Sequence, residues 1–489
     1  MERTGLSRAK IINEVLKIGH GDLHIFKDVC LQAVQQDSEM FAHLVAWNHK
    51  VGGVMDSKKA FPVLALRDGH DWFYENAVAH MCMLDPRDFL SSLRFHMELH
   101  GNGFRAQHAA RKWVDKAAKR YIHERETNIG WFDRTVLQHR KSMKALYRIL
   151  KVKPSARAQA VLFDGERPQG SIFEKVAALK SMEPRQAAGT ILQYRIPYLV
   201  AVGAVGGIKD KPDIVLALIE QMSRTELVTN TKMLERFGVF ENPALKAAYE
   251  KGMQEQKREK RPTSALKAGK ASKVVVSEKV SRKLEAVQEA QLDAQKSIPG
   301  NGLILGDMSG SMQMSVEVAK EVAALVARKA EGEVSLVFFN EAPRGFDVTG
   351  KSLSDIQTMT RSIRANGGTS ISCGLSFAME QGKQIDWIVI VSDGGENRVP
   401  LFSMVYKKYE QKTGLTPAIY MVHVPGDQNI LDRRCSDEGI EINKYEIGSK
   451  VESYMLTNIV NSIRPGHFAL FDEIMAVPLL TLDEVFANK

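Results

Sequence analysis

Cysteine is scarce, with four residues in a chain of 489. The four are scattered along the sequence, at Cys30, Cys82, Cys373 and Cys435. No two of them form a C-x-x-C pair, which argues against a zinc module and against a disulfide framework. We therefore expect a protein of a reducing, cytoplasmic environment.

Long hydrophobic runs are also lacking. The amino terminus, Met1 to Arg8, has no apolar core of the kind found in signal peptides. The longest weakly apolar stretch, Ile196 to Ile208, is interrupted by proline and glycine and falls short of the roughly 20 residues that a membrane helix needs. We expect no membrane segment, and 44% hydrophobic with 26% charged residues is ordinary for a globular chain of two to four domains.

Acidic residues are in short supply only in the first part of the chain. Residues 1–300 carry 49 Lys+Arg and 34 Asp+Glu, a net charge of +15, whereas residues 301–489 carry 18 and 24, a net charge of −6; the two add to the +9 of the whole chain. The positive part suggests a polyanion such as RNA as its partner, and the acidic part suggests a protein or metal role. Alternatively, the excess of Lys+Arg over Asp+Glu in residues 1–300 is only a solvent-exposed basic surface without a partner.

In the acidic part, a short apolar run ends in an oxygen-rich loop. Leu303 to Leu305 has the length of a buried parallel strand, and Asp307, Ser309 and Ser311 follow at alternate positions. A carboxylate and two hydroxyls suit Mg²⁺, which takes oxygen ligands and keeps several waters. Any strand-to-helix turn prefers the same residue types, so this motif alone is weak evidence for a metal.

Two later loops strengthen the metal hypothesis. Gly367 to Ser370 presents the hydroxyl of Thr369 just before a helical pattern, and a second apolar run, Trp387 to Val391, ends near Asp393. In a doubly wound sheet neighbouring strands release their loops at one edge, so the three loops can converge. A dinucleotide site is the rival reading, but the first loop lacks the G-x-G-x-x-G turn and places an acid where phosphate would lie.

These loops lie in a regular alternation of strands and helices that predicts a Rossmann-like parallel sheet. The expected strands are 303–305, 334–339, 387–391, 418–424 and 441–447, and the expected helices are 316–329, 353–363, 371–382, 401–411 and 451–463. The order and spacing of the loops resemble the von Willebrand factor A domain and its metal-ion-dependent adhesion site. That resemblance implies that the metal, Mg²⁺ or another divalent cation, is coordinated by Asp307, Ser309, Ser311, Thr369 and Asp393. It also implies an acidic protein ligand at the metal. No nucleophile or base accompanies these residues, so we expect a docking site and not an enzyme.

Residues 1–250 show apolar residues at three- and four-residue spacing, broken by proline or glycine, which predicts an all-α array. Helices are expected at Asp28 to His49, Asp71 to Met83, Pro86 to His100, Pro184 to Tyr194 and Pro212 to Phe237. Helix pairs of this size suggest HEAT-like packing without a fixed sequence period.

Phe104 to His123 is expected to be a helix with two different faces. At 100° per residue, one side collects residues that would pack inward, namely Ala110, Trp113, Val114, Ala117 and Tyr121. The other side is cationic and consists of Arg105, His108, Lys112, Lys116, Lys119, Arg120 and His123. Because Asp115 lies off this stripe, no acid is expected to neutralise it, although a basic stripe is often only the wet face of a helix.

The next expected helix, Trp131 to Leu150, extends the basic surface. Arg140, Lys144 and Arg148 recur at four-residue spacing, and His139 lies beside them. RNA phosphates are the expected counterpart, with His139, Tyr121 and Trp131 available for stacking on unpaired RNA or hydrogen bonding to it. A lone aromatic on a helix is more often a core residue, and we expect this of Trp131.

The stretch from Gly101 to His139 resembles a known module. Gly101-x-Gly-Phe-Arg105, the basic helix after it, Gly130-Trp131 and Leu137-Gln-His139 are similar to the corresponding part of the TROVE module of the Ro autoantigen family. In that family a ring of helical repeats precedes a von Willebrand A domain, which is the order found here. The resemblance implies a ring that binds single-stranded ends of noncoding or misfolded RNA in a basic hole. It implies a structured Y-type small RNA on the outer surface, with a role for His139, and an exoribonuclease as a further partner.

The sequence therefore predicts a HEAT-like helical-repeat TROVE ring followed by a Rossmann-like von Willebrand A domain. We expect the TROVE module at 1–298 with a basic exposed segment near 251–283, the von Willebrand A domain at 299–465, and a carboxy-terminal segment, 466–489, that packs on the ring. The expected function is that of a non-enzymatic RNA-binding scaffold. The alternative is an adhesion or chaperone adaptor whose helical part binds protein. A ribonuclease has less support, because the histidines in the basic patch have no placed acid partner.

Overall fold

We analysed a computed structural model of the chain. It describes residues 11–254, 297–426, 430–446 and 469–487, apart from positions 13, 17, 20, 53, 102–107 and 328, together with the single residues 460 and 463. The basic segment expected near 251–283 and the helix expected at 451–463 lie almost wholly outside these residues. The chain forms two compact units, one of residues 1–65 and 292–479, the other of residues 66–291 and 480–489.

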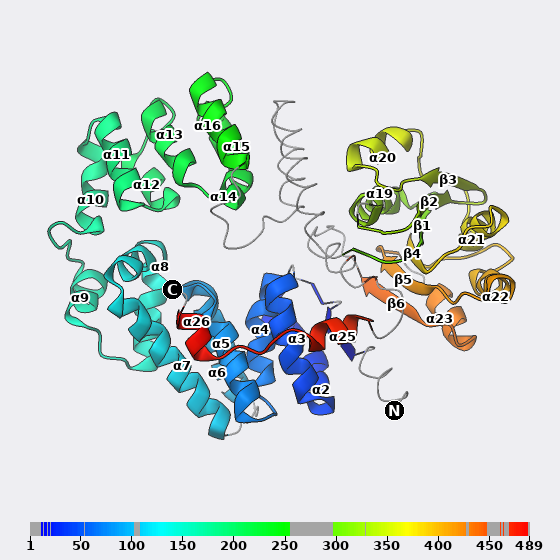
Figure 1. The fold of residues 1–489 in the computed structure, drawn as a ribbon, viewed down its shortest axis with the longest axis horizontal. Helices are drawn as coiled ribbons and strands as arrows, with labels where there is room; N and C mark the ends of the chain where they lie inside the picture. The colour runs from blue at the N-terminus through cyan, green and yellow to red at the C-terminus, as the bar shows by residue number, and fades with distance from the viewer. Residues whose placement is uncertain are drawn as a thin grey trace. The chain divides into compact units, whose positions relative to one another are not determined.

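The described residues before 255 form helices and no strands, as predicted (Figure 1). Those of the first unit are η1 (Leu23–Phe26), α2 (Lys27–Gln36), α3 (Ser38–Val51) and α4 (Met55–Ala65). Those of the second unit are α5 (Asp71–Cys82), α6 (Pro86–Gly101), α7 (His108–Thr127), α8 (Ile129–Leu150), α9 (Ala156–Ala158), η2 (Gln159–Asp164), α10 (Ile172–Ala178), η3 (Leu179–Ser181), α11 (Pro184–Tyr194), α12 (Tyr198–Val205), α13 (Pro212–Gln221), α14 (Arg224–Thr229), α15 (Thr231–Arg236) and α16 (Pro243–Gln254). Neighbours pack in pairs, α5 on α7, α7 on α8 and α11 on α13, which agrees with the predicted HEAT-like architecture.

For two long helices predicted from periodicity, the predicted bounds were wrong, because each region is divided into shorter helices. The helix expected at 28–49 is broken at Asp37, whose backbone is extended (φ −160°, ψ 95°) and whose carboxylate accepts a hydrogen bond from the Met40 amide at 2.9 Å. Asp37 thereby ends α2 and caps α3. The helix expected at 212–237 is three short helices, and the second starts with a capping box of Ser223 and Glu226.

The acidic part folds into a six-stranded sheet in the order β3-β2-β1-β4-β5-β6. Its strands are β1 (Gly302–Asp307), β2 (Val334–Phe339), β3 (Pro343–Asp347), β4 (Trp387–Ser392), β5 (Ala418–His423) and β6 (Ile442–Glu446). All neighbouring strands are parallel except β2 and β3. The predicted Rossmann-like parallel sheet is present, and it carries one antiparallel edge strand, β3, that was not predicted.

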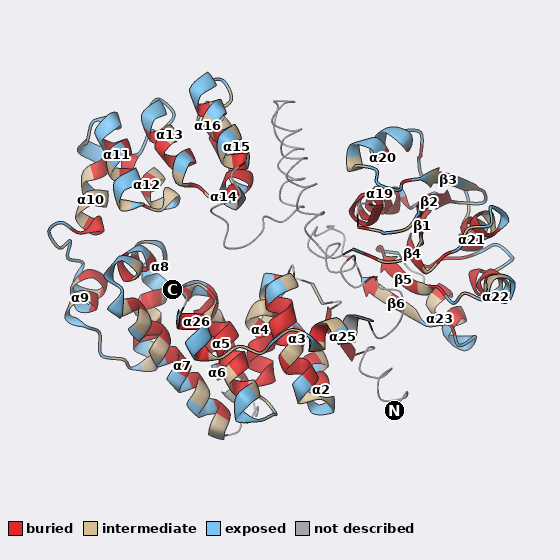
Figure 2. Cartoon of the chain, in the orientation of Figure 1, coloured by how far each residue is buried: buried red, intermediate tan, exposed pale blue. Residues whose placement is uncertain are grey.

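The residues of β1 alternate between the two faces of the sheet. Leu303 and Leu305 join the core beneath α21 (Ile371–Glu380) and α22 (Phe402–Thr413). On the other face α19 (Gln313–Ala327) lies so close that a Cβ on Gly306 would come within 2.8 Å of the Ala319 Cβ. Both faces are thus covered, and Figure 2 shows the central strands buried between helices. A central strand buried on both faces reads as a continuous apolar run, which is why the sequence revealed it.

Other helices of the described chain are α20 (Leu353–Met359), α23 (Ile430–Asp437) and, near the carboxy terminus, α25 (Ala469–Met475). Helix α25 packs on α3 in the first unit, where the Val477 carbonyl accepts a hydrogen bond from His43 at 2.7 Å. The last helix, α26 (Leu482–Ala487), packs on α5 in the second unit, and the Leu480 amide donates to Asn76 at 2.9 Å. The end of the chain thus lies against helices of the amino-terminal part.

Candidate metal centre and nucleic-acid surface

The first predicted metal ligand stands at the carboxyl end of the central strand. Asp307 is the last residue of β1 and is fully buried. One of its oxygens accepts from the Ser309 amide at 2.8 Å, and the other accepts from the Ser392 hydroxyl at 2.6 Å. Ser309 is buried and Ser311 is exposed. The Asp307 carboxylate is therefore fixed in orientation before any ligand arrives.

Backbone hydrogen bonds join the three loops. The Gly310 amide donates to the Gly367 carbonyl at 3.1 Å, and the Asn366 amide donates to the Met308 carbonyl at 2.7 Å, so the first two loops are held together. Gly367 has a φ of +78°, which favours glycine. Thr369 is tied to the third loop, because its amide donates to the Asn397 side chain at 3.2 Å. The loops predicted to converge do lie side by side.

The electrostatics of Asp307 suit a cation. Burial raises the pKa of Asp307, the hydrogen bonds from Ser392 and Ser309 lower it, and the nearby charge of Asp393 raises it again, for a net pKa above the usual value. Among the described residues, no lysine or arginine forms an ion pair with either carboxylate. A divalent cation between the two would offset both the desolvation and the repulsion.

The donor set is one of hard oxygens. The described residues contain no cluster of three or more His, Cys, Asp or Glu side chains that could hold a metal, so the centre depends on hydroxyls beside the two carboxylates. Such a set fits Mg²⁺ with part of its water shell and does not fit zinc. The residues present therefore fit the predicted metal.

Sequence reasoning missed the side chains that support the third loop. The His423 Nε2 donates to the Asp393 carbonyl at 2.9 Å, and its Nδ1 lies 2.7 Å from a carboxylate oxygen of Glu446. Gly426 lies so close that a Cβ there would come within 2.4 Å of the Asp393 Cβ. His423 ends β5, Gly426 lies in the loop after it, and Glu446 ends β6. No local motif links them to Asp393.

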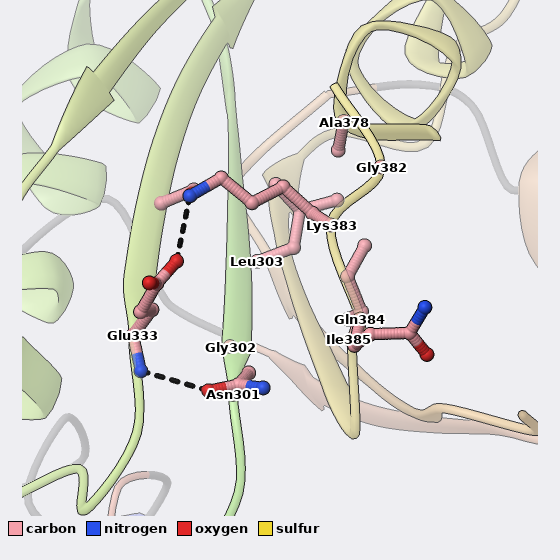
Figure 3. A pocket seen from close by; sticks show the side chains of 10 residues that line it. Asn301, Gly302, Leu303, Glu333, Ala378, Gly382, Lys383, Gln384 and Ile385 are labelled. Atoms are coloured by element: carbon pink, nitrogen blue, oxygen red, sulfur yellow. Dashed lines mark hydrogen bonds and ion pairs between the residues drawn. The ribbon is translucent and has the colours of Figure 1, made fainter. Parts of the chain in front are cut away.

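A cavity of about 270 Å³ lies near the amino ends of β1 and β2 (Figure 3). The Lys383 ammonium is 2.7 Å from the Glu333 carboxylate at this cavity, and the Glu333 amide donates to Asn301 at 2.8 Å. The metal loops leave the opposite ends of these strands. The cavity therefore contributes nothing to the candidate metal centre.

In the second unit, α7 has the two faces that its sequence predicts. Ala110, Val114, Ala117 and Tyr121 are buried, whereas the cationic side is represented by exposed Lys112, Lys116, Lys119 and His123. Trp113 is half-buried and carries the Lys116 ammonium 4.4 Å from its ring centroid. Arg105 lies outside the described residues, and of His108 only the backbone is described, as the first residue of α7.

The expectation that no acid neutralises the stripe was wrong. Lys119 pairs with Asp115 at 2.7 Å, because an i,i+4 spacing brings the two side chains together. Arg120 pairs with Glu124 at 3.0 Å and with Asp483 of α26 at 2.5 Å. Lys112 and Lys116 form no ion pair with any residue of the described chain. Exposed pairs such as Lys119–Asp115 are worth only ~0–1 kcal/mol, so Lys119 can still exchange its partner.

On α8 the predicted basic residues have mixed surroundings. His139 is half-buried at a kink with non-helical angles (φ −129°, ψ 31°), and burial is the main cause that lowers its pKa. The Arg140 guanidinium donates to the Leu162 carbonyl at 3.0 Å, and the Lys144 ammonium lies 5.7 Å from the Phe163 ring centroid. Both cations therefore lie against η2.

Two aromatic residues proposed for base stacking are used inside the helical unit. Tyr121 is buried and its hydroxyl donates to the Leu84 carbonyl at 2.9 Å. The Arg125 guanidinium lies 3.4 Å from the Tyr121 centroid and 4.3 Å from that of Trp131, so it occupies a face of each ring. An aromatic residue that is exposed in the described part of the chain is Trp72, with 58% of its surface accessible. It lies next to Asp71, which accepts a hydrogen bond from the Trp113 indole.

The chain is similar to known proteins in its three-dimensional structure. No family model matches the chain, and no curated protein matches it. The crystal structure of the Deinococcus radiodurans Ro (RSR) protein superimposes with a TM-score of 0.64 over 94% of this chain and 99% of the other, at 15% sequence identity. The chain has the fold of a bacterial Ro protein. The Ro architecture expected from the sequence, a helical part followed by a von Willebrand A-like sheet, is thereby confirmed. No helix in the described residues is long and apolar enough to cross a membrane.

Proposed function

We propose that the chain is a non-enzymatic RNA-binding scaffold of the Ro type, with a separate Mg²⁺-dependent docking site for an acidic protein ligand. The observation that carries the RNA proposal is the exposed cationic face of α7, where Lys112 and Lys116 have no acidic partner among the described residues. Lysine ammonium groups on one helix face suit backbone phosphates. The Ro fold supports the same reading.

Within this proposal, single-stranded ends of noncoding or misfolded RNA bind the cationic face of α7, and a structured Y-type small RNA binds near His139. An exoribonuclease is a proposed partner that would act on RNA held by the scaffold. At the metal, the chain's own residues hold Mg²⁺ through Asp307 and Asp393 with Ser309, Ser311 and Thr369, directly or through water. A carboxylate of the docked protein would complete the coordination of the metal held by these residues.

The direct test is to purify the tagged chain from cells and sequence the RNA that copurifies with it. A structured small RNA together with RNAs that have single-stranded ends is the expected result. Recovery of no enriched RNA, with a protein bound in a salt-insensitive way, would favour the adaptor alternative.

His139→Ala is expected to weaken the binding of a structured small RNA by about 1–3 kcal/mol and to leave the salt dependence of binding almost unchanged. The reason is that the lowered pKa of His139 keeps the imidazole neutral near pH 7, so it contributes a stack or a base-edge hydrogen bond rather than a phosphate contact. Binding to structured and unstructured RNA and the melting temperature should be measured together, with exposed Gln138→Ala as the control. Equal losses for all RNAs with a lower melting temperature would mean that His139 serves the helical core.

Asp483→Asn is expected to raise the affinity for single-stranded RNA by about two- to fivefold at low salt, an effect that salt screens. This carboxylate is 85% exposed and is paired with Arg120, so its replacement takes a negative charge away from Arg120 and leaves Glu124 as the acidic partner of that guanidinium. Asp210→Asn is the control, because it removes the same charge within the second unit, from an exposed turn before α13, a helix that packs on α11 and α16; it should have no effect. Unchanged affinity in Asp483→Asn would show that Arg120 does not contact RNA.

A further inference from the structure

A buried carboxylate without a predicted role lies in the same loop as the proposed metal ligand Asp393. Glu396 is only 3% exposed and follows Asp393 by three residues, in the loop after β4. Both of its carboxylate oxygens accept from the Phe402 amide, at 3.0 and 3.1 Å. Burial raises the pKa of the Glu396 carboxyl above its usual value, and the backbone amides of Phe402, Ser372 and Ile371 act in the opposite direction.

These donors are the first residues of two helices. Ile371 and Ser372 begin α21, and Phe402 begins α22. Neither helix has a side-chain hydrogen bond from its own N-cap residue, Ser370 or Leu401. The amides at a helix start have no partner within the helix, so Glu396 supplies the cap for both. Two helix dipoles direct their positive ends toward the same carboxylate, which stabilises its charge.

This double cap joins two of the three metal loops. Thr369 lies two residues before Ile371, and Asp393 lies three residues before Glu396. Arg434 of α23 also contacts Glu396, because its guanidinium donates to the Glu396 carbonyl at 3.3 Å and lies 3.9 Å from the Glu396 carboxylate. A shift of Glu396 would therefore move the start of α21, and Thr369 with it, relative to Asp393.

We propose that Glu396 is a positioning residue for the metal centre, which fixes the separation of Thr369 and Asp393 by capping α21 and α22 together. The inference rests on the proposed Mg²⁺ site. Outer residues that orient metal ligands are worth about 10- to 100-fold in metal affinity. A residue that only capped helices would change the stability of the fold and leave the affinity for Mg²⁺ unaltered.

The test is Mg²⁺ titration of the full chain by calorimetry for wild type, Glu396→Ala and Glu396→Gln, with thermal melting of each protein without metal. Glu396→Ala should bind Mg²⁺ at least about tenfold more weakly. The Mg²⁺ affinity of Glu396→Gln should lie between those of Glu396→Ala and wild type, because the glutamine side chain keeps one acceptor oxygen for the two helix starts. Asp355→Ala is the matched control, since this acid caps α20 through Ser352 away from the metal loops. It should lower the melting temperature without changing the Mg²⁺ affinity.

The outcomes separate the inference from the function on which it rests. If Glu396→Ala folds and binds Mg²⁺ within about twofold of wild type, Glu396 is only a helix cap and the inference is wrong. The Gln variant decides this point if the Ala variant does not fold. If wild type itself binds no Mg²⁺, the metal proposal fails, and the inference fails with it.

Discussion

Replacing Lys112, Lys116 and Lys119 together by alanine is expected to lower the affinity for single-stranded RNA about 100-fold at 0.1 M salt. On a single strand each neutralised phosphate contributes a log–log salt slope of about −0.7, which corresponds to about fivefold in affinity per contact at this salt concentration. Three lost contacts multiply to the expected value, and the slope should become shallower by about 2. Fluorescence anisotropy with a labelled oligonucleotide at several salt concentrations measures both quantities.

The control for this variant removes the same charge from the sheet domain. Lys351, Lys408 and Lys412 are exposed there, and their joint replacement by alanine changes the net charge equally. A control that lost as much affinity as the α7 variant would mean that RNA responds to total charge and not to the cationic face of α7.

Asp307→Asn is expected to abolish the stabilisation of the chain by Mg²⁺. Mg²⁺ at 100 times its Kd stabilises the wild-type fold by about 2.7 kcal/mol, which corresponds to a rise in melting temperature of about 5–10 °C for a domain of this size. Without metal, the variant should melt no lower than wild type, because it removes a buried charge that repels Asp393. RNA affinity should stay within a few-fold, since the cationic face is on other helices.

Melting curves with and without Mg²⁺ measure this effect. Asp386→Asn serves as the control, because Asp386 accepts from the Asn301 amide at the opposite edge of the same sheet. The Mg²⁺ response should survive in that control. A persistent Mg²⁺ response in Asp307→Asn would place the metal elsewhere.

The parts of the fold that the sequence predicted are those with a strong local pattern. β1 and β4 are buried on both faces and read as apolar runs. β3 was missed because it is a mostly exposed edge strand and its sequence has no apolar run. Its one aromatic side chain, Phe346, packs against Phe338 of β2. The break at Asp37 was missed because the apolar spacing continues across it.

The same distinction holds for the candidate sites. The five predicted metal ligands lie at the end of a strand or in the loop next to a strand or helix end, so local motifs could identify them. Glu396 and His423 act through tertiary contacts, as does the pairing of Arg120 with Asp483, 363 residues away in sequence. Only the folded arrangement reveals that these residues support a ligand loop or neutralise a cation.

The central claim, that the helical part binds RNA through phosphates, is tested most directly by the affinity of the wild-type chain for a single-stranded RNA between about 50 and 300 mM salt. We predict tight binding at low salt and a log–log slope of about −2 or steeper, from at least three phosphate contacts. Absence of binding at low salt, or an affinity that does not change with salt, would contradict the account.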